Sequence, residues 1–379
     1  MPELPGLYVH VPFCSAICPY CDFAVTTGGA EKRRAFLDVL EAEIELVDES
    51  WEPVETLYLG GGTPSALETG GLERLLSRLR RRFDPTARAR LFLEANPEDV
   101  TPDTLTAWRD LGVATLSLGV QSFDGETLAT LGRRHGPAQA RSAVEAALKA
   151  GFDTISVDLI YGVPGRSIAD WAADLELVIT LAPDHVSCYQ LTFHRQTPFG
   201  HWKDSGRMVE PPEDDRAELF LLTHERLAAA GYDGYEVSNF ARRPEHRSRH
   251  NAKYWRRAAY LGLGPSAHSF DGARRRWWNE PDLAVWQRRV TAGERPVAGE
   301  EELSNEEIAL ERVMLGLRMR AGVDFGRLEK ETDRPLLAAN RKRLEDWRRR
   351  GLVELDGDRA VPTLRGLAIA DRLAAEIEI

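Results

Sequence analysis

Three cysteines, Cys14, Cys18 and Cys21, lie within the stretch GLYVHVPFCSAICPYCDFAV, directly after the first predicted strand. Thiolates at these spacings on one short loop can converge on a metal centre. Zinc needs four ligands, and His10 would complete an H-x3-C-x3-C-x2-C set in a zinc-stabilised interaction protein. The alternative is a [4Fe–4S] cluster in which three irons are held by cysteine and the fourth remains open. The cluster is favoured because no second pair of ligands follows Cys21.

Further polar and glycine residues follow later predicted strands. The loop LGGGTPS contains Gly61, Gly62 and Thr63, and its glycines allow the backbone to approach a ligand closely. Four polar residues come at or just after the ends of the third, fourth and fifth predicted strands: Glu94, Gln121, Arg133 and Asp158. Carboxylates can accept hydrogen bonds from ribose hydroxyls, and an arginine can bind a carboxylate with two donors. One such residue alone would indicate a salt bridge or a helix cap, but four on one rim favour a binding site.

Short β-rich runs alternate with amphipathic helical stretches from residue 7 to about 192. The predicted strands are LYVHVP, VETLYLG, RLFLEA, VATLSLGVQ, TISVDLIYG and HVSCYQLT. Serial strand–helix units indicate a parallel sheet in an α/β fold. We therefore predict a partial (β/α)6 TIM-type barrel with its site at the carboxyl ends of the strands.

The chain divides into three predicted parts. Residues 1–240 form the barrel, residues 241–300 form a connecting segment that contains HNAKYW, and residues 301–379 read as helix, helix, hairpin and helix. That last order is typical of an α+β winged-helix-like domain. Winged helices often bind DNA, but the helix RKRLEDWRRR carries both signs of charge and the net charge of the chain is −11. Packing against protein is therefore preferred, and no nucleic-acid partner is expected.

Composition and cysteine usage indicate the class of protein and its cellular compartment. Of 379 residues, 43% are hydrophobic and 29% are charged, which is typical of a folded globular protein. No apolar run approaches the length of a membrane span, and the N-terminus lacks a basic region followed by an apolar core. Four cysteines, three of them clustered, suit a reducing compartment, so we expect a cytoplasmic protein. Cys188 reads as a buried strand residue.

The pattern CxxxCxxC with Tyr20 before the last cysteine resembles the radical S-adenosylmethionine (SAM) superfamily. The resemblance implies that the amino and carboxylate groups of SAM bind the open iron of the cluster, and that an electron from the cluster cleaves SAM to a deoxyadenosyl radical. YVHVPFC, CDF, GGGTP, GVQSF, DLIYG and the C-terminal domain resemble the coproporphyrinogen oxidase-like branch across almost the whole chain. This resemblance implies that SAM is contacted by Tyr8, Tyr20, Gly61, Gly62, Thr63, Glu94, Gln121, Arg133 and Asp158.

Two features separate the subfamilies of that branch. Oxygen-independent coproporphyrinogen III oxidases have a further cysteine where this chain has Phe23, and they have a longer N-terminal arm. HNAKYW is instead similar to the HNxxYW motif of the heme chaperone subfamily. The resemblance implies a protein that binds a [4Fe–4S] cluster, SAM and heme, and that transfers heme to an acceptor hemoprotein, with respiratory proteins among the candidates. The radical decarboxylation of coproporphyrinogen III is the alternative function.

His250, in HNAKYW, is the candidate axial ligand of heme, with aromatic neighbours as walls. The alternative is a histidine that is hydrogen-bonded to its surroundings in a packing element under the barrel. The sequence does not identify the heme acceptor or the electron donor. It also leaves open contact with a membrane surface and the oligomeric state, for which a homodimer is one candidate.

Overall fold

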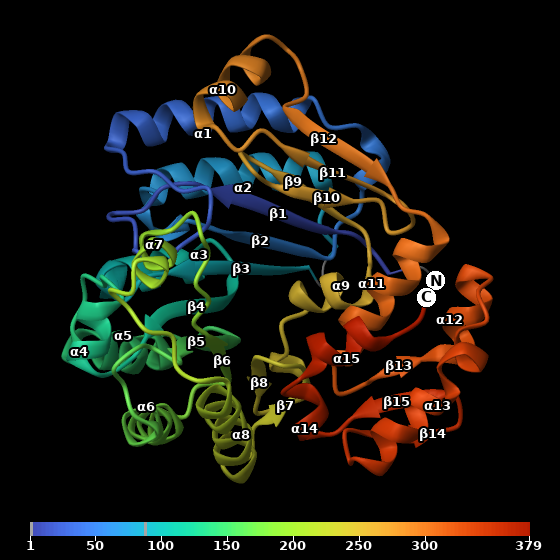
Figure 1. Cartoon of the computed structure of the whole chain (residues 1–379). Coiled ribbons are helices and arrows are strands. Elements are labelled where there is room, and N and C mark those ends of the chain that lie inside the picture. Colours follow the sequence, from blue (N-terminus) through green and yellow to red (C-terminus); the bar gives the residue numbers. More distant parts are fainter. Residues whose placement is uncertain (1–2, 87–88) are drawn as a thin grey trace.

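The computed structural model describes residues 3–86 and 89–379, and its central element is a run of parallel strands (Figure 1). The strands are β1 (Gly6–Val11), β2 (Thr56–Gly61), β3 (Arg90–Ala95), β4 (Val113–Gln121), β5 (Thr154–Tyr161) and β6 (His185–Gln190). Each pairs in parallel with the next one along the chain. All the predicted strands of this region are therefore confirmed.

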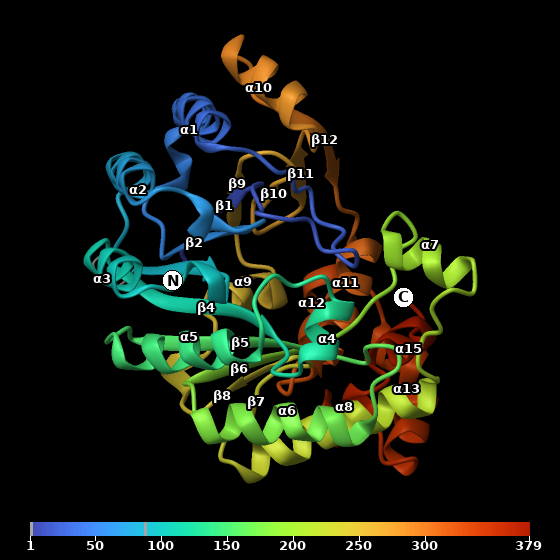
Figure 2. The same cartoon turned by 90° about the vertical axis from the view of Figure 1, so that its left-hand side faces the viewer.

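Helices cover the outer face of this sheet (Figure 2). They are α1 (Ala30–Glu45), α2 (Thr69–Phe83), α3 (Pro102–Asp110), α5 (Pro137–Lys149), α6 (Ile168–Leu181) and α8 (Glu213–Ala229). The short helix α4 (Gly125–Thr130) lies between β4 and α5 in the sequence. Short 3-10 turns occupy Glu49–Trp51, Pro64–Ala66, Pro97–Asp99 and Pro244–His246. The alternation of side chains along a strand explains the layering. Leu7, Val9 and Val11 of β1 are fully buried in the core, whereas Tyr8 and His10 lie on the other face of β1.

Residues 193–302 extend the sheet at both of its ends. They contain the helices α7 (Pro198–Asp204), α9 (Asn251–Arg256) and α10 (Leu283–Thr291), and the strands β7 (Asp233–Gly234), β8 (Asn239–Ala241), β9 (Tyr260–Leu263), β10 (His268–Phe270), β11 (Arg275–Asn279) and β12 (Val297–Glu302). Strand β8 pairs with β6, and β9 pairs in parallel with β1. Residues 241–300, predicted as a connecting segment, thus carry strands of the main sheet.

The sheet is an open one. Among the described residues its order is β12-β11-β10-β9-β1-β2-β3-β4-β5-β6-β8-β7, and β12 and β7 do not pair to close it. The prediction of a partial rather than a complete barrel is therefore confirmed. No helix among the described residues is both long enough and apolar enough to cross a bilayer.

The C-terminal part forms a small α+β domain with its own core (Figure 1). Its elements are α11 (Asn305–Leu317), β13 (Val323–Asp324), α12 (Phe325–Thr332), α13 (Leu336–Arg349), β14 (Val353–Asp356), β15 (Arg359–Pro362), α14 (Leu364–Leu367) and α15 (Ala370–Glu376). The predicted hairpin turns at Gly357, whose φ of +58° suits glycine. The predicted hairpin and the helices around it are confirmed, whereas β13 and α12, which lie between the first two predicted helices, and α14 were not predicted.

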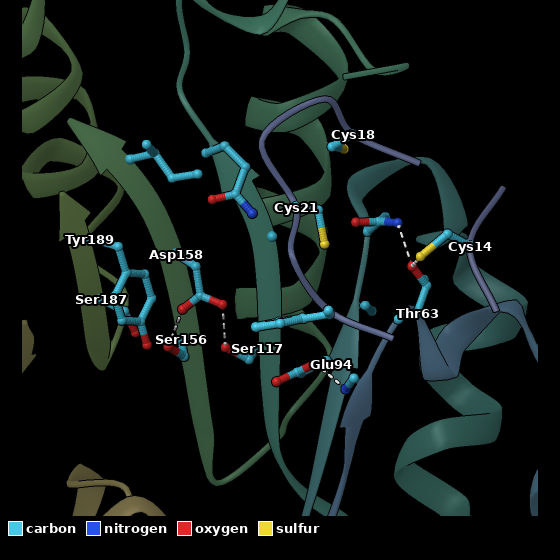
Figure 3. A pocket seen from close by; sticks show the side chains of 18 of the residues that line it. Cys14, Cys18, Cys21, Thr63, Glu94, Ser117, Ser156, Asp158, Ser187 and Tyr189 are labelled. Atoms are coloured by element: carbon cyan, nitrogen blue, oxygen red, sulfur yellow. Dashed lines mark hydrogen bonds between the residues drawn. The ribbon is translucent and has the colours of Figure 1, made fainter. Parts of the chain in front are cut away.

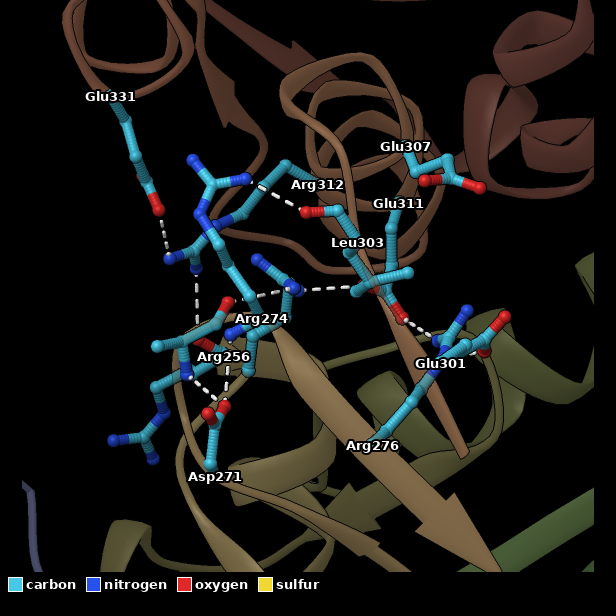
Figure 4. A network of polar contacts seen from close by, with 12 residues as sticks. Arg256, Asp271, Arg274, Arg276, Glu301, Leu303, Glu307, Glu311, Arg312 and Glu331 are labelled. Carbon is cyan, nitrogen blue, oxygen red and sulfur yellow. Dashed lines mark hydrogen bonds and ion pairs between the residues drawn. The ribbon is translucent and has the colours of Figure 1, made fainter. Parts of the chain in front are cut away.

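A polar network joins this domain to the sheet (Figure 4). Glu311 of α11 accepts from the buried Arg257, with an Nε to Oε2 distance of 2.6 Å, and from Arg276 of β11 at 2.8 Å. Arg312, also on α11, donates to the backbone carbonyl of Arg256 at 2.8 Å. Helix α11 is therefore bonded both to the end of α9 and to the extended sheet.

Candidate functional site

A cavity of about 470 Å³ opens at the carboxyl ends of the parallel strands (Figure 3). Its lining includes eleven of the thirteen predicted site residues: Cys14, Cys18, Tyr20, Cys21, Gly61, Gly62, Thr63, Glu94, Gln121, Arg133 and Asp158. Segments that are distant in the sequence converge here because parallel strands present their carboxyl ends at one edge. The other two predicted residues, Tyr8 and His250, do not line this cavity.

The cysteine loop is folded back on itself beside the cavity. The backbone N–H of Cys14 donates to the carbonyl of Thr26 at 2.9 Å, and that of Cys21 donates to the carbonyl of Cys18 at 3.1 Å. Burial raises the pKa of the Cys14 thiol and raises that of Cys21 to about 11. Both are therefore thiols at neutral pH in the metal-free chain, and binding a metal centre would release their protons.

A chain of polar side chains connects two of the cysteines. Thr63 donates to the Cys14 sulfur at 3.6 Å and accepts from Asn96 at 3.1 Å. Arg133 donates to the Asn96 side chain at 2.5 Å and to the Cys18 sulfur at 3.6 Å. Sequence reasoning missed Asn96, although its place directly after β3, two residues beyond Glu94, is the kind of position that indicated the others. These hydrogen-bonded side chains orient Arg133 toward the cysteines.

One buried nitrogen of Arg133, the Nε atom, has no hydrogen-bond partner among the described residues. An unpaired buried donor is costly unless a ligand completes it. A ligand carboxylate would do so, since guanidinium and carboxylate form charge-assisted bonds. The residues present thus fit an anionic group next to the cysteines.

The glycine loop packs against the cysteine segment. Gly61 has a φ of +105°, and a Cβ atom there would lie 2.5 Å from Nδ1 of His10. A Cβ at Gly62 would lie 2.8 Å from the carbonyl oxygen of Phe13. We expected these glycines to make room for a ligand. In the structure they also make room for β1 and the cysteine loop, so backbone approach within the protein already requires them.

Two carboxylates lie on the strand side of the cavity (Figure 3). Glu94 accepts from the hydroxyl of Tyr58 at 2.6 Å and from the N–H of Gly61 at 3.2 Å, and burial raises its pKa to about 7. Asp158 accepts from Ser117 at 3.0 Å, and burial raises the pKa of this carboxyl as well. Buried, oriented carboxyl groups of this kind can bind the hydroxyls of a sugar.

Gln121 and Tyr20 complete the lining. Gln121 has a φ of +67°, which is unusual for a residue with a side chain, and it lies at an irregularity in the pairing of β4 with β5. Strain of this kind concentrates at functional sites. The ring of Tyr20 lies 6.2 Å from that of Phe199, and burial raises the pKa of its phenol.

His10 is not available as a fourth metal ligand. Its Nε2 donates to the carbonyl of Ala24 at 2.9 Å, so its Nδ1 accepts from the hydroxyl of Tyr8 at 3.1 Å. Within the part of the chain that the structure describes, no three His, Cys, Asp or Glu side chains are grouped to hold one metal ion. A four-iron cluster does not need such a group, because each thiolate binds a different iron.

His250 is buried between the main sheet and α9. Its Nδ1 lies 2.8 Å from the hydroxyl of Thr56, and its Nε2 lies 2.8 Å from the hydroxyl of Tyr254. Burial lowers the pKa of His250 to about 3. Since both ring nitrogens are engaged, the geometry matches the packing element that was the alternative to an axial heme ligand.

The open parallel sheet and the cavity lined by three cysteines define a radical SAM protein. The Radical SAM superfamily profile matches residues 8–178, and the HemN C-terminal domain profile matches residues 303–369. The heme chaperone HemW of Mycobacterium tuberculosis is 38% identical, covering 98% of this chain and 94% of its own length. The chain belongs to the HemW family of radical SAM proteins.

Other relatives agree with this placement. The heme chaperone HemW of Bacillus subtilis is 32% identical over 92% of this chain and 93% of its own length. Among solved structures, the coproporphyrinogen III oxidase HemN of Escherichia coli, described as a radical SAM enzyme, superposes with a TM-score of 0.85. It is 25% identical, and the match covers 99% of this chain and 90% of that one. The two proteins therefore share the whole architecture.

Proposed function

We propose that this protein is a heme chaperone that binds a [4Fe–4S] cluster and SAM and transfers heme to an acceptor hemoprotein. The observation that carries the proposal is the single cavity that gathers Cys14, Cys18 and Cys21 with the glycine loop and two buried carboxylates. The likeness to relatives named heme chaperones extends over almost the whole chain and supports the choice of heme as cargo.

The three cysteines hold the cluster in this proposal, and the cavity holds SAM beside it. The unpaired Nε of Arg133 binds the carboxylate of SAM, and backbone carbonyls of the glycine loop accept from its amino group. Glu94 and Asp158 bind ribose hydroxyls. When bound, the cluster supplies an open iron for SAM and an electron for reductive chemistry.

The remaining predicted SAM contacts fall into two groups. Tyr20, Gly61, Gly62, Thr63 and Gln121 line the main cavity and stay proposed as contacts. Tyr8 lines a neighbouring cavity and donates to His10, so it reaches SAM in this proposal only if the ligand extends beyond the main cavity.

The test is a hemin titration of the anaerobically reconstituted protein, followed by the Soret absorbance, with transfer to an apo-hemoprotein as the second step. We expect saturation near one heme per chain and loss of the chaperone-bound spectrum when the acceptor is added. Serum albumin, which binds heme without this fold, serves as the transfer control. A protein that takes up no heme would contradict the proposal.

Coproporphyrinogen III oxidation is the second candidate, favoured by the structural match to HemN. Phe23, which occupies the position of the additional cysteine of the oxidases, counts against it; its side chain is 62% exposed at the cavity. The discriminating measurement is anaerobic turnover of coproporphyrinogen III with SAM and a reductant. Formation of protoporphyrinogen IX would establish the oxidase, and we expect none.

A further inference from the structure

A second cavity, of about 310 Å³, lies next to the main one on the same face of the sheet. Asp22 and Phe23, which directly follow Cys21, line both cavities. The ring of Tyr8 lines the second cavity and lies 6.0 Å from that of Tyr58, which lines the main one. A ligand in the second cavity would therefore lie against the end of the cysteine loop. The volume of this second cavity is within the range of ligand pockets.

An unengaged imidazole faces this cavity. His268 begins β10 and is exposed, and its ring stacks on Trp278 with the ring centroids 5.9 Å apart. Among the described residues its ring nitrogens form no hydrogen bond or ion pair. A neutral imidazole has a free lone pair for a metal.

The other histidines differ in their surroundings. Seven of the nine have at least one ring nitrogen bonded to protein: His10, His135, His185, His194, His224, His246 and His250. The remaining one besides His268 is His201, which is exposed on α7 and lines neither cavity. His194 lines the main cavity with its Nδ1 3.2 Å from Asp22, whereas in the second cavity His268 is the histidine whose two ring nitrogens both lack a bond among the described residues.

Aromatic side chains form the walls of the second cavity. Phe23 is largely exposed, and the rings of Tyr254 and Tyr260 meet edge to face, 4.7 Å apart. His250 fixes Tyr254 through the 2.8 Å bond to its hydroxyl. Tyr254 and Tyr260 are half-buried, so with Phe23 they give the cavity a mainly aromatic lining that a flat apolar ring could cover. The histidine of HNAKYW thus positions a wall of the cavity and is not itself open to a ligand.

We propose that the second cavity is the heme site, with His268 as the axial ligand and Phe23, Tyr254 and Tyr260 around the macrocycle. The inference rests on the proposed chaperone function and assigns its cargo site. Binding forms one coordinate bond from the imidazole lone pair to the iron and requires no redox step. Asp22 and Phe23 line both cavities, so heme in the second cavity would contact the end of the cysteine loop. Binding of heme would in this way be coupled to occupancy of the main cavity.

The experiment compares His268→Gly with the wild type and with His201→Gly as the matched surface control. Hemin titrations are followed in the Soret band on reconstituted protein, with and without free imidazole. We expect the Kd for heme to rise at least about tenfold in His268→Gly, the Soret maximum to shift, and imidazole to restore the wild-type spectrum. His201→Gly should behave as the wild type does.

The affinity for SAM is measured on the same variants, because the main cavity is adjacent. Phe23→Ala should weaken heme binding without shifting the Soret maximum, since it removes a wall and keeps the ligand. A His268→Gly variant that binds heme as the wild type does, or that loses SAM affinity and retains heme affinity, overturns the assignment. A wild type that binds no heme overturns the proposed function itself.

Discussion

At the scale of single residues, the cysteines differ in what surrounds them. Cys14 and Cys18 are partly exposed and are joined through Thr63, Asn96 and Arg133 at the cavity. Cys188 lies on β6, is 1% exposed and packs in the hydrophobic core. Ligand capacity therefore follows from access to the cavity and from neighbouring donors, not from residue type alone.

We expect Cys14→Ala, Cys18→Ala and Cys21→Ala each to lose most of their iron after anaerobic reconstitution, because each removes one of three protein ligands. Cys188→Ala is the matched control and should retain the iron of the wild type, since Cys188 does not line the cavity. Iron and sulfide analysis gives the measurement. Equal loss of iron in Cys188→Ala would show that the ligand set is wrong.

At the scale of elements, one buried carboxyl connects a helix with the extended sheet. Glu43 of α1 accepts from the N–H of Gly264 at 2.7 Å and from Asn279 of β11 at 2.6 Å. Burial raises the pKa of Glu43 to about 7. Helix α1 is thus bonded to the strands that follow β9, far along the chain. This contact helps to hold β9 against β1 beside the second cavity.

The raised pKa of Glu43 predicts a pH dependence of stability. Between about pH 4.5 and 7 the folded state retains the proton that the unfolded state has lost, so this group lowers the free energy of unfolding as the pH rises. We expect Glu43→Gln to remove that decline. The difference in the free energy of unfolding between the variant and the wild type should therefore change by about 2 kcal/mol in favour of the variant as the pH rises from about 5 to 8.

Urea unfolding followed by tryptophan fluorescence measures this difference. Glu345→Gln, on the exposed face of α13, is the control and should keep a constant difference from the wild type. A Glu43→Gln variant with the same pH dependence as the wild type would show that this carboxyl does not retain its proton in the folded protein.

At the scale of the whole molecule, the C-terminal domain is held to the sheet by ion pairs. Arg257 is 3% exposed at its side chain, lies over the ring of Phe270 and relies on Glu311 as its charged partner. Glu311 also bonds Arg276 of β11. A buried guanidinium without its partner is costly, so this network makes docking of the domain depend on Glu311.

We expect Glu311→Ala to destabilise the protein by about 3 kcal/mol, because it leaves Arg257 buried and unpaired. The measurement is urea unfolding, with hydrogen exchange to locate the weakened part at α11 and α9. Glu354→Ala, on the exposed side of β14, should stay within about 0.5 kcal/mol of the wild type. Equal stability of the two variants would contradict the role of the network.

Much of the fold and most of the cavity could be predicted from the sequence. The six parallel strands could be predicted because each is a short β-rich run between helical stretches. Such runs are recognised from the order of neighbouring residues alone. The cysteine loop, the glycine loop and the strand-end residues were readable because parallel strands present their carboxyl ends together. These features depend on local sequence and on one topological rule.

The tertiary structure decided the rest. The pairing of β9 with β1 joins residues about 250 positions apart, and no local pattern specifies such a partner. Burial of His250 and exposure of His268 follow from that pairing, because it places α9 against the sheet and β10 at the rim of the second cavity. The sequence by itself predicted most of the residues that line the main cavity, because they follow the ends of strands. Only the packing of distant segments decided which histidine keeps a free imidazole, since hydrogen-bond partners come from across the fold.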